Sequence, residues 1–183
     1  MDSSRKIAYM NWGCEIMVFQ GVFMINDAFI KFNDIEGEFQ KLIYKDNIKL
    51  LRWEWTVGQM PSANLGSSGG TGKLAVEGLY FEPHIDKFSP KLLRHCLLGE
   101  CIPEAVITIR KSGGSPLEYF RITLQNVIII GVQPVGYRTM RAPREEVGLS
   151  FSRSNMDYVI QSEKGIFMGL SSMGYDIEAN IIT

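Results

Sequence analysis

The chain has 183 residues, of which 45% are hydrophobic and 21% charged, the balance of an ordinary globular protein. This length suffices for one domain with one sizeable core. The net charge of −1 gives the chain as a whole no electrostatic reason to bind nucleic acid or to insert into a membrane. Three cysteines, Cys14, Cys96 and Cys101, are too few for a disulfide framework and favour folding in a reducing compartment.

The first residues differ in pattern from the rest of the chain. Early basic residues lead into an apolar run, IMVFQGVFMI, that is too short to span a bilayer. Glu15 opens this run and no small-x-small cleavage site follows, so the segment matches a signal peptide poorly. The sequence predicts an N-terminal extension over 1–23, for which an upstream start codon is one explanation, and a single domain over 24–183.

The first half of the domain is patterned as strands. DAFIKF at 27–32 is followed by turn residues, and the alternation over 48–57 predicts a half-buried strand. In that strand Ile48, Leu50, Arg52, Glu54 and Thr56 share one face. The opposite, predicted core face carries Leu51, Trp53, Trp55 and Val57. Residues 73–83 are again extended, and Pro83 makes a central sheet position unfavourable beyond them.

One segment interrupts the strands with a helical pattern. Ser89 is the predicted helix cap, Pro90 the first helical residue and Gly99 the stop signal. The helical spacing predicts one apolar face made of Leu92, Leu93, Cys96 and Leu97. A short helix over 89–98 is expected.

Strand patterns resume and continue to the end of the chain. Strands are predicted at 104–111 and 117–132, joined by the hairpin loop SGGSP, and the run VIII at 127–130 predicts burial on both faces. A loop is expected over 133–145, strands within 146–161 and 174–182, and a loop over 162–173. Seven to nine strands and one helix predict a mainly β sandwich or barrel with the helix on one flank.

The glycine-rich stretch GSSGGTGK at 66–73 resembles a phosphate-binding loop only superficially. The phosphate-loop pattern needs glycine at position 67, where this chain has Ser67, and a hydroxyl at position 74, where it has Leu74. A helix should also follow, so that its amides face the phosphates, but a strand is predicted there. The stretch therefore predicts a connection between strands and no nucleotide site.

No other group of residues predicts catalysis, a cofactor or a metal. His95, Cys96 and Cys101 are fewer than the four ligands of a structural zinc site, and no nucleophile-elbow pattern accompanies His84 or His95. The acidic pairs Glu36/Glu38 and Glu145/Glu146 are expected on solvated faces. Trp53 and Trp55 could line a sugar site, although core packing is the simpler interpretation. A long loop and exposed strand edges instead favour subunit association.

Several segments together resemble the Hcp family, the haemolysin-coregulated proteins of bacterial type VI secretion. The matching motifs are DAFIKFNDIEGE at 27–38, WEWTVGQ at 53–59, GGTGKLAVEGLYFEPHIDKFSPKLL at 69–93, AVITIRKSGGSPLEYFRITLQNVIII at 105–130, EEVGLSFS at 145–152 and DYVIQ at 157–161. The resemblance covers about 24–182. It implies a β-barrel of two packed antiparallel sheets with one flanking short α-helix.

The resemblance also implies partners and a place of action. Family members form homo-hexameric rings that stack into a tube inside a contractile sheath, under a spike of the valine-glycine-repeat family. The tube leaves the bacterial cytoplasm on contraction without a signal peptide, and the rings carry effector proteins. Family members begin a few residues before the first strand, so the extension over 1–23 is a departure. Thr183 follows shortly after the last predicted strand, so the variants of the family that carry a fused effector domain are not expected here.

The family's extended loop corresponds to residues 58–73, and the resemblance predicts that it contacts a neighbouring subunit or ring. The predicted interface residues are Gln59, Met60, Pro61, Ser62, Asn64, Leu65, Gly66, Gly69, Gly70, Thr71, Gly72 and Lys73. An alternative is a monomeric β-barrel that binds a small ligand or carbohydrate at Trp53 and Trp55. A hydrolase is the weakest alternative, because no nucleophile and base are evident.

Overall fold

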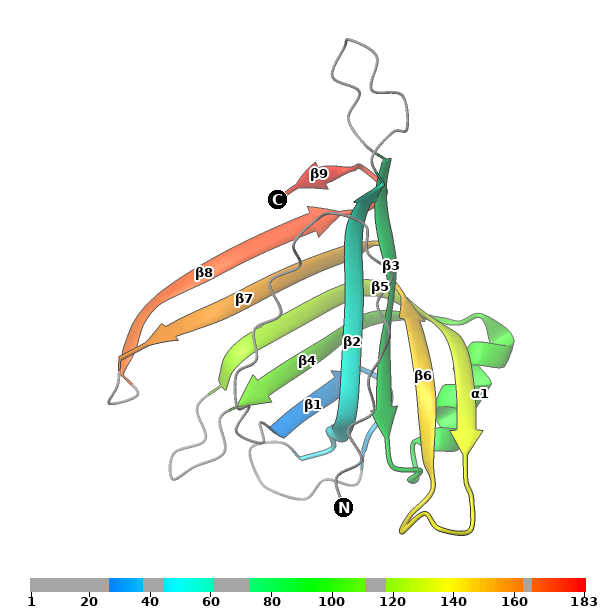
Figure 1. Cartoon of the computed structure of the whole chain (residues 1–183). Helices are drawn as coiled ribbons and strands as arrows, with labels where there is room; N and C mark the ends of the chain where they lie inside the picture. Colours follow the sequence, from blue (N-terminus) through cyan, green and yellow to red (C-terminus); the bar gives the residue numbers. More distant parts are fainter. Residues whose placement is uncertain (1–26, 38–44, 61–72, 111–117, 163–165) are drawn as a thin grey trace, which may run out of the picture.

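The computed structural model describes residues 27–37, 45–60, 73–110, 118–162 and 166–183, and the predicted extension over 1–23 lies outside them. These residues form nine strands and one helix (Figure 1). In chain order the elements are β1 (Asp27–Phe32), β2 (Ile48–Met60), β3 (Lys73–Pro83), α1 (Ser89–Leu98), β4 (Cys101–Arg110), β5 (Glu118–Val135), β6 (Arg144–Ser150), β7 (Arg153–Gln161), β8 (Phe167–Asp176) and β9 (Ile181–Ile182).

Part of the sheet closes on itself as a barrel. The strands follow the order β4-β1-β2-β3-β6-β5, and β5 pairs in turn with β4, so the ring of strands is complete. All of these pairings are antiparallel. The prediction of a mainly β barrel with antiparallel sheets and one flanking helix is confirmed.

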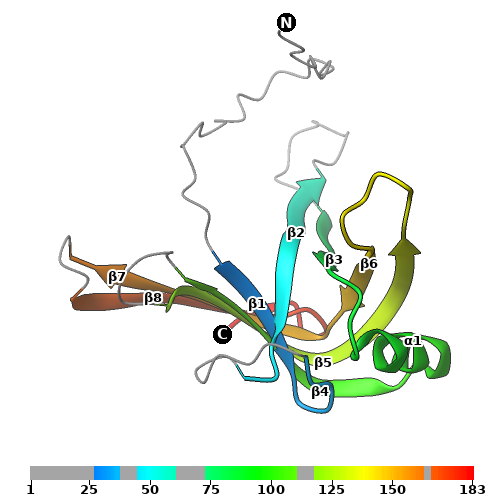
Figure 2. The same cartoon turned by 90° about the horizontal axis from the view of Figure 1, so that it is seen from below.

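The remaining strands leave the barrel as a projection that we call the wing, made of β7, β8 and β9. The first half of β5 pairs with β7, whereas its second half pairs with β6. Asn126, between the two halves, has a φ of 52°, a left-handed conformation that Asn tolerates better than most residues. Figure 2 shows β7 and β8 projecting from one side of the barrel and α1 lying on the opposite side.

The core fills the barrel with aliphatic and aromatic side chains. Ile30, Phe32, Leu79, Phe81, Ile107, Ile122, Leu124, Val147 and Leu149 are all at most 2% exposed. In the run VIII, Val127 and Ile129 join this core, but Ile128 and Ile130 are exposed. The prediction of burial on both faces was wrong, because nothing in the described part of one chain covers the outer face of β5 here.

The predicted inward face of β2 was correct for only half of the strand. Trp53 and Trp55 pack against the core as expected, but Ile48 and Leu50 are buried and Leu51 is exposed. The pairing with β3 shifts register between Leu50 and Arg52. Such a β-bulge adds one residue to a strand and thereby exchanges its two faces, which simple alternation does not anticipate.

The helix has the predicted bounds but not the predicted contacts. Phe88 occupies the N-cap position, Ser89 follows inside the helix, and Gly99 ends it with a φ of 63°. Only Leu92 is buried and Cys96 is half-buried, whereas Leu93 and Leu97 are exposed, so the predicted apolar face was too wide. A short helix on the flank of a barrel buries a single narrow stripe.

The loop predicted over 162–173 is largely a strand. β8 begins at Phe167 and pairs with β7 along its length. Its glycines and serines gave a loop-like composition, but the backbone hydrogen bonds to β7 hold it extended. The loop predicted over 133–145 is shorter than expected at both ends, since β5 continues to Val135 and β6 begins at Arg144.

Candidate assembly surface

The predicted interface loop lies between the ends of β2 and β3. At these ends Gln59 pairs with Leu74, and Met60 pairs with Lys73, as the last rungs of a two-stranded ribbon. The other predicted interface residues, within 61–72, lie outside the described residues. Their contact with another subunit therefore stays a prediction.

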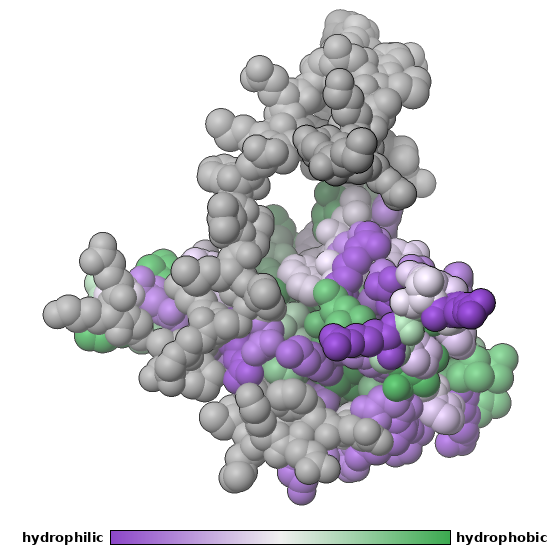
Figure 3. Space-filling view, turned by 60° about the horizontal axis from the view of Figure 1, so that its bottom comes forward, coloured by the Kyte–Doolittle hydropathy of each residue, from purple (hydrophilic) through white to green (hydrophobic). Residues whose placement is uncertain are grey.

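The wing exposes large apolar side chains on both strands. In β7 and β8 these are Tyr158, Ile160, Phe167, Met168, Leu170 and Met173, and in β9 they are Ile181 and Ile182. At the left of Figure 3, where the wing lies, apolar atoms stand among polar ones. Groups of exposed large apolar side chains are one mark of an interaction site.

The exposure of the wing was not predicted from the sequence. Met156, Tyr158 and Ile160 alternate with Asp157 and Val159 in the sequence, but strands were predicted within 146–161 without any assignment of their faces. Alternation predicts that one face of a strand is apolar, but it does not predict whether the same chain covers that face.

A polar network stiffens the wing on its other face. The Asn155 amide donates to Asp157 Oδ1 at 2.9 Å, and the Ser172 hydroxyl donates to the same oxygen at 2.6 Å. Nearer the barrel, Arg153 Nε donates to Asp176 Oδ2 at 2.6 Å. The Ala179 amide and Arg153 lower the pKa of Asp176, which keeps this carboxylate charged and bound. These bonds join β7 to β8 through their side chains.

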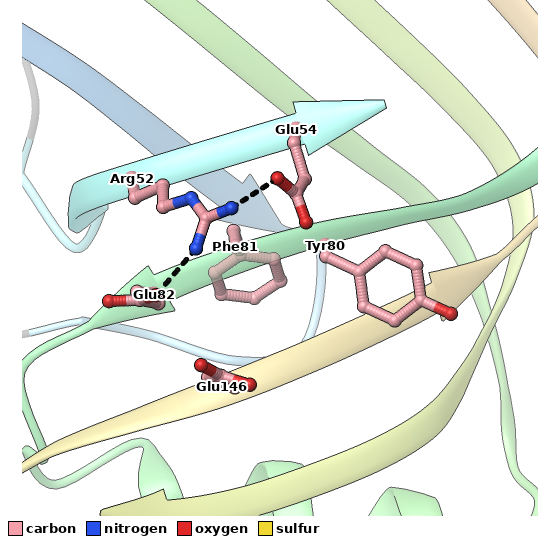
Figure 4. A pocket seen from close by; sticks show the side chains of 6 residues that line it. All are labelled: Arg52, Glu54, Tyr80, Phe81, Glu82 and Glu146. Carbon is pink, nitrogen blue, oxygen red and sulfur yellow. Dashed lines mark hydrogen bonds and ion pairs between the residues drawn. The ribbon is translucent and has the colours of Figure 1, made fainter. Parts of the chain in front are cut away.

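The outer face of the barrel carries a small charged pocket (Figure 4). Its lining residues come from β2, β3 and β6: Arg52, Glu54, Tyr80, Phe81, Glu82 and Glu146. Arg52 bonds Glu54 and, at 3.4 Å, Glu82, so its guanidinium neutralises two of the three carboxylates. These mutual ion pairs explain the charges of Arg52, Glu54 and Glu82 without a ligand.

The other sequence candidates lie where a structural role explains them. His95 Nδ1 is 3.2 Å from Glu100 Oε2, and Cys96 packs against the core. No group of three or more His, Cys, Asp or Glu side chains within the described ranges could hold a metal ion. Within those ranges, too, no helix is long and apolar enough to cross a membrane.

Glu145 was expected on a solvated face and is instead 1% exposed. It accepts a hydrogen bond of 2.8 Å from the Ser89 hydroxyl, which links β6 to the first turn of α1. Burial raises the pKa of the Glu145 carboxyl. A titratable group in this position holds the helix against the barrel. Its partner in the acidic pair, Glu146, is exposed as predicted.

Each of the two tryptophans packs against another aromatic ring and against the core. Trp53 stacks on Phe120 with ring centroids 6.1 Å apart, and Trp55 meets Phe151 edge-on at 5.5 Å. The Trp55 indole N–H donates to the Glu77 carbonyl at 3.2 Å. These contacts favour a packing role for Trp53 and Trp55 over a sugar site.

Comparison with known proteins gives matches over most of the chain. A family model described as type VI secretion system effector, Hcp, matches residues 29–158. The protein hcp1 of Pseudomonas aeruginosa is 36% identical over 160 residues, which cover 86% of this chain and 99% of that protein. The crystal structure of Hcp1 from Salmonella typhimurium has a TM-score of 0.70 at 34% identity, covering 86% of this chain and 99% of that one.

A second solved structure agrees with the first. The type VI secretion system effector from Yersinia pestis has a TM-score of 0.68 at 37% identity, covering 82% of this chain and 99% of that one. The fold defines a mainly β protein, a closed barrel with a wing whose large apolar side chains the described residues leave exposed. The family match makes this specific: the chain belongs to the Hcp family, the tube proteins of type VI secretion.

Proposed function

We propose that the chain is a ring-forming subunit of the type VI inner tube. Six copies form a ring, rings stack into a tube, and the tube is expelled when the surrounding sheath contracts. The observation that supports this most directly is the apolar wing, which the described part of a single chain leaves uncovered. Family membership over most of the domain supports the same role.

The ring proposal is tested by the mass of the protein in solution. Size-exclusion chromatography with light scattering, followed by native mass spectrometry, should give six times the chain mass of 20.7 kDa. Negative-stain images should show rings. A protein that stays monomeric from micromolar to millimolar concentration would contradict the proposal.

The proposal includes the partners expected of such a tube. The ring lumen holds effector proteins, the tube ends at a valine-glycine-repeat spike, and export proceeds from the cytoplasm without a signal peptide. In this role the protein is structural and turns over no substrate. Affinity purification from a secreting cell should recover spike and effector proteins, and a secretion mutant should retain the chain inside the cell.

The loop between β2 and β3 is proposed to take part in stacking. Deleting residues 64–71 should leave the barrel folded, because β2 and β3 are already joined by cross-strand pairs up to Met60 and Lys73. Ring or tube assembly should weaken. A deletion variant that loses its β-type circular dichroism would show that the loop supports the barrel itself.

A further inference from the structure

We propose that the outer face of the barrel across β3, β6 and β5 is a docking surface for a segment of another protein that presents an arginine beside an apolar side chain. Its apolar part consists of Tyr80, Ile128 and Ile130, and its charged part is the pocket of Figure 4. The inference goes beyond the proposed ring, because the whole surface lies on one chain.

The apolar part of this surface lies on the outside of the barrel wall. Ile128 and Ile130 are the half of the run VIII that points away from the core, and they are 40% and 51% exposed. Tyr80, on β3, is 45% exposed. Single exposed apolar side chains are ordinary on a soluble protein, but a group of them is one mark of an interaction site.

Gly148 of β6 brings Tyr80 and Ile130 together. A methyl group at Gly148 would lie 2.9 Å from the Tyr80 ring and 3.1 Å from the Ile130 side chain, so both side chains lie against the bare backbone of β6. They reach it from β3 and β5, the two strands that flank β6 in the sheet. Figure 4 shows the Tyr80 ring extending from β3 toward β6. The glycine therefore leaves room for a continuous apolar platform over three strands.

The pocket beside this platform holds three carboxylates and has two arginines to neutralise them. Arg52 bonds Glu54 and one oxygen of Glu82, and Arg144 lies 3.3 Å from the other oxygen of Glu82. Glu146 is exposed and forms no ion pair with any residue that the structure describes. Its negative charge is therefore available to a partner.

The strand register sets Glu146 against a second carboxylate. Phe81 pairs with Val147, so the adjacent residues Glu82 and Glu146 stand opposite each other on the outer face of β3 and β6. Like charges that are directly opposite across two strands destabilise the sheet. A positive group bound at Glu146 would offset this repulsion, which favours a cationic partner over an anionic or neutral one.

An arginine side chain fits both the charge and the ring. Its guanidinium is planar, stacks on aromatic faces and bonds carboxylates through two N–H groups, which a lysine ammonium does not. Tyr80 pairs with Gly148, so it is a diagonal neighbour of Glu146 and one guanidinium can reach both. The pocket volume of about 300 Å³ includes open solvent, so it holds the end of one side chain and not a whole small-molecule ligand.

The isoleucines indicate what stands next to that arginine. Ile130 lies against the same glycine as Tyr80, and Ile128 lies two residues away on the same outer face of β5. A leucine or a similar side chain beside the arginine would cover these isoleucines. Removing their apolar area from water adds to the affinity. The partner is therefore a protein segment in which an arginine and an apolar residue are neighbours.

The test titrates the whole chain with three capped dipeptides and follows the δ1 methyl signal of Ile130 by NMR. The probes are arginyl-leucine, lysyl-leucine and citrullyl-leucine, and citrulline has nearly the shape of arginine without its charge. We expect arginyl-leucine to shift the Ile130 signal and to bind most tightly. Citrullyl-leucine should bind about two- to fivefold more weakly, the range of an exposed ion pair. The methyl signal of Ile107, which is buried in the core, should not move.

Matched variants locate the charge and the ring. Glu146→Gln removes the carboxylate without an ion pair, and Glu178→Gln removes the same charge from an exposed position in the turn between β8 and β9. The affinity for arginyl-leucine should fall about two- to fivefold in the first variant and stay unchanged in the second. Tyr80→Leu should remove the preference for arginine over lysine, because leucine has no aromatic face.

Several results would overturn the docking surface. One is an Ile130 signal that answers none of the dipeptides, or that answers citrullyl-leucine as strongly as arginyl-leucine. Another is equal weakening in Glu146→Gln and Glu178→Gln, which would mean a general attraction by negative charge. Circular dichroism checks the fold of Tyr80→Leu, and if that variant is unfolded the two glutamine variants decide alone. Because the surface lies on one chain, none of these results depends on whether rings form.

Discussion

The barrel and the wing carry the same strand pattern with opposite degrees of burial. On the shared face of β5, Ile122 is 0% exposed, whereas Ile160, on the same face of β7, is 47% exposed. Both regions alternate apolar and polar residues, and both are held by antiparallel pairing. The barrel closes because β4 pairs with β5, but the wing has no element of its own chain opposite it among the described residues.

Apolar area that is buried within the chain and apolar area that is left exposed contribute to different equilibria. Apolar area buried within the chain stabilises the folded monomer, while apolar area left exposed contributes only when another molecule covers it. The chain therefore has one apolar surface that is buried in the barrel and a second, on the wing, that the described residues leave exposed. Substitutions on them should affect different measurements.

The largest effect is expected from truncating a barrel residue. Ile122→Ala leaves a cavity in a packed core and should lower the free energy of unfolding by about 2–5 kcal/mol. Ile160→Ala, on the same face of the wing, should change the stability of the monomer by less than about 0.5 kcal/mol, as surface substitutions do. Urea denaturation of each monomer measures both values.

An equal loss of stability from Ile122→Ala and Ile160→Ala would contradict the expected difference between barrel and wing. That result would mean that the wing is covered within one chain, for instance by residues outside the described ranges. The uncovered wing would then no longer support the proposed ring.

The sequence predicted the strands of the barrel more completely than those of the wing. Period-two alternation, the Pro83 stop and the Gly99 stop predicted most strands and the helix, because those signals are local. The bulge near Leu51 and the left-handed Asn126 were not predicted, since both depend on pairing with strands distant in sequence. Each exchanges the inner and outer faces of a strand, so one local irregularity misplaces several residues.

The candidate surface shows the same limit. The loop residues from Gln59 to Lys73 came from resemblance to a family, and their contacts remain untested. The apolar residues Phe167, Met168 and Leu170 indicated a strand of the wing, but Gly169 between them and the two serines that follow favoured a loop. The exposure of a side chain depends on the whole fold, so a short stretch of sequence does not predict it.

The next effect concerns the link between β6 and α1. Ser89→Ala removes the hydroxyl that donates to Glu145, so a buried carboxylate loses its hydrogen bond, at a cost of about 1–3 kcal/mol. Hydrogen exchange of the helix amides should rise along with this loss. The wing amides should not change, because the link lies at the other side of the barrel. Faster exchange in both regions would show that barrel and wing unfold together.

Glu145→Gln should stabilise the protein at neutral pH, whereas Ser89→Ala should destabilise it. Burial raises the pKa of this carboxyl, so its charged form destabilises the folded state relative to the unfolded chain. The wild-type protein therefore gains stability as the pH falls through the raised pKa, and loses it as the pH rises. Glutamine still accepts from Ser89 without the charge. The variant should be the more stable protein at neutral pH, with the difference shrinking in acid.

Within the wing, Gly174→Ala should loosen β9. A methyl group there would lie 2.3 Å from Thr183 Oγ1 and 3.0 Å from the Thr183 carbonyl oxygen, so the terminal strand must move. Because fraying terminal segments contribute little, the global cost should be about 1 kcal/mol or less. Gly169→Ala is the matched control, since its methyl group would meet Ile160 at an ordinary 3.8 Å. Hydrogen exchange at Ile181 and Ile182 should increase in the first variant alone.

The smallest effect is expected at an ion pair on the barrel rim, and its pH dependence opposes that of Glu145. Lys49 lies 2.9 Å from Asp27, and Arg110 bonds the same carboxylate at 2.8 Å. These partners, Lys49 first, lower the pKa of Asp27, so the stabilisation is present above the ordinary carboxyl pKa and is lost as the pH falls through the lowered one.

Because Lys49 is half exposed, Lys49→Ala should cost only about 0.2–1 kcal/mol at neutral pH. It should also move the loss in acid to a higher pH, as urea titrations at several pH values would show. An unchanged acid profile would mean that Arg110 alone holds the carboxylate.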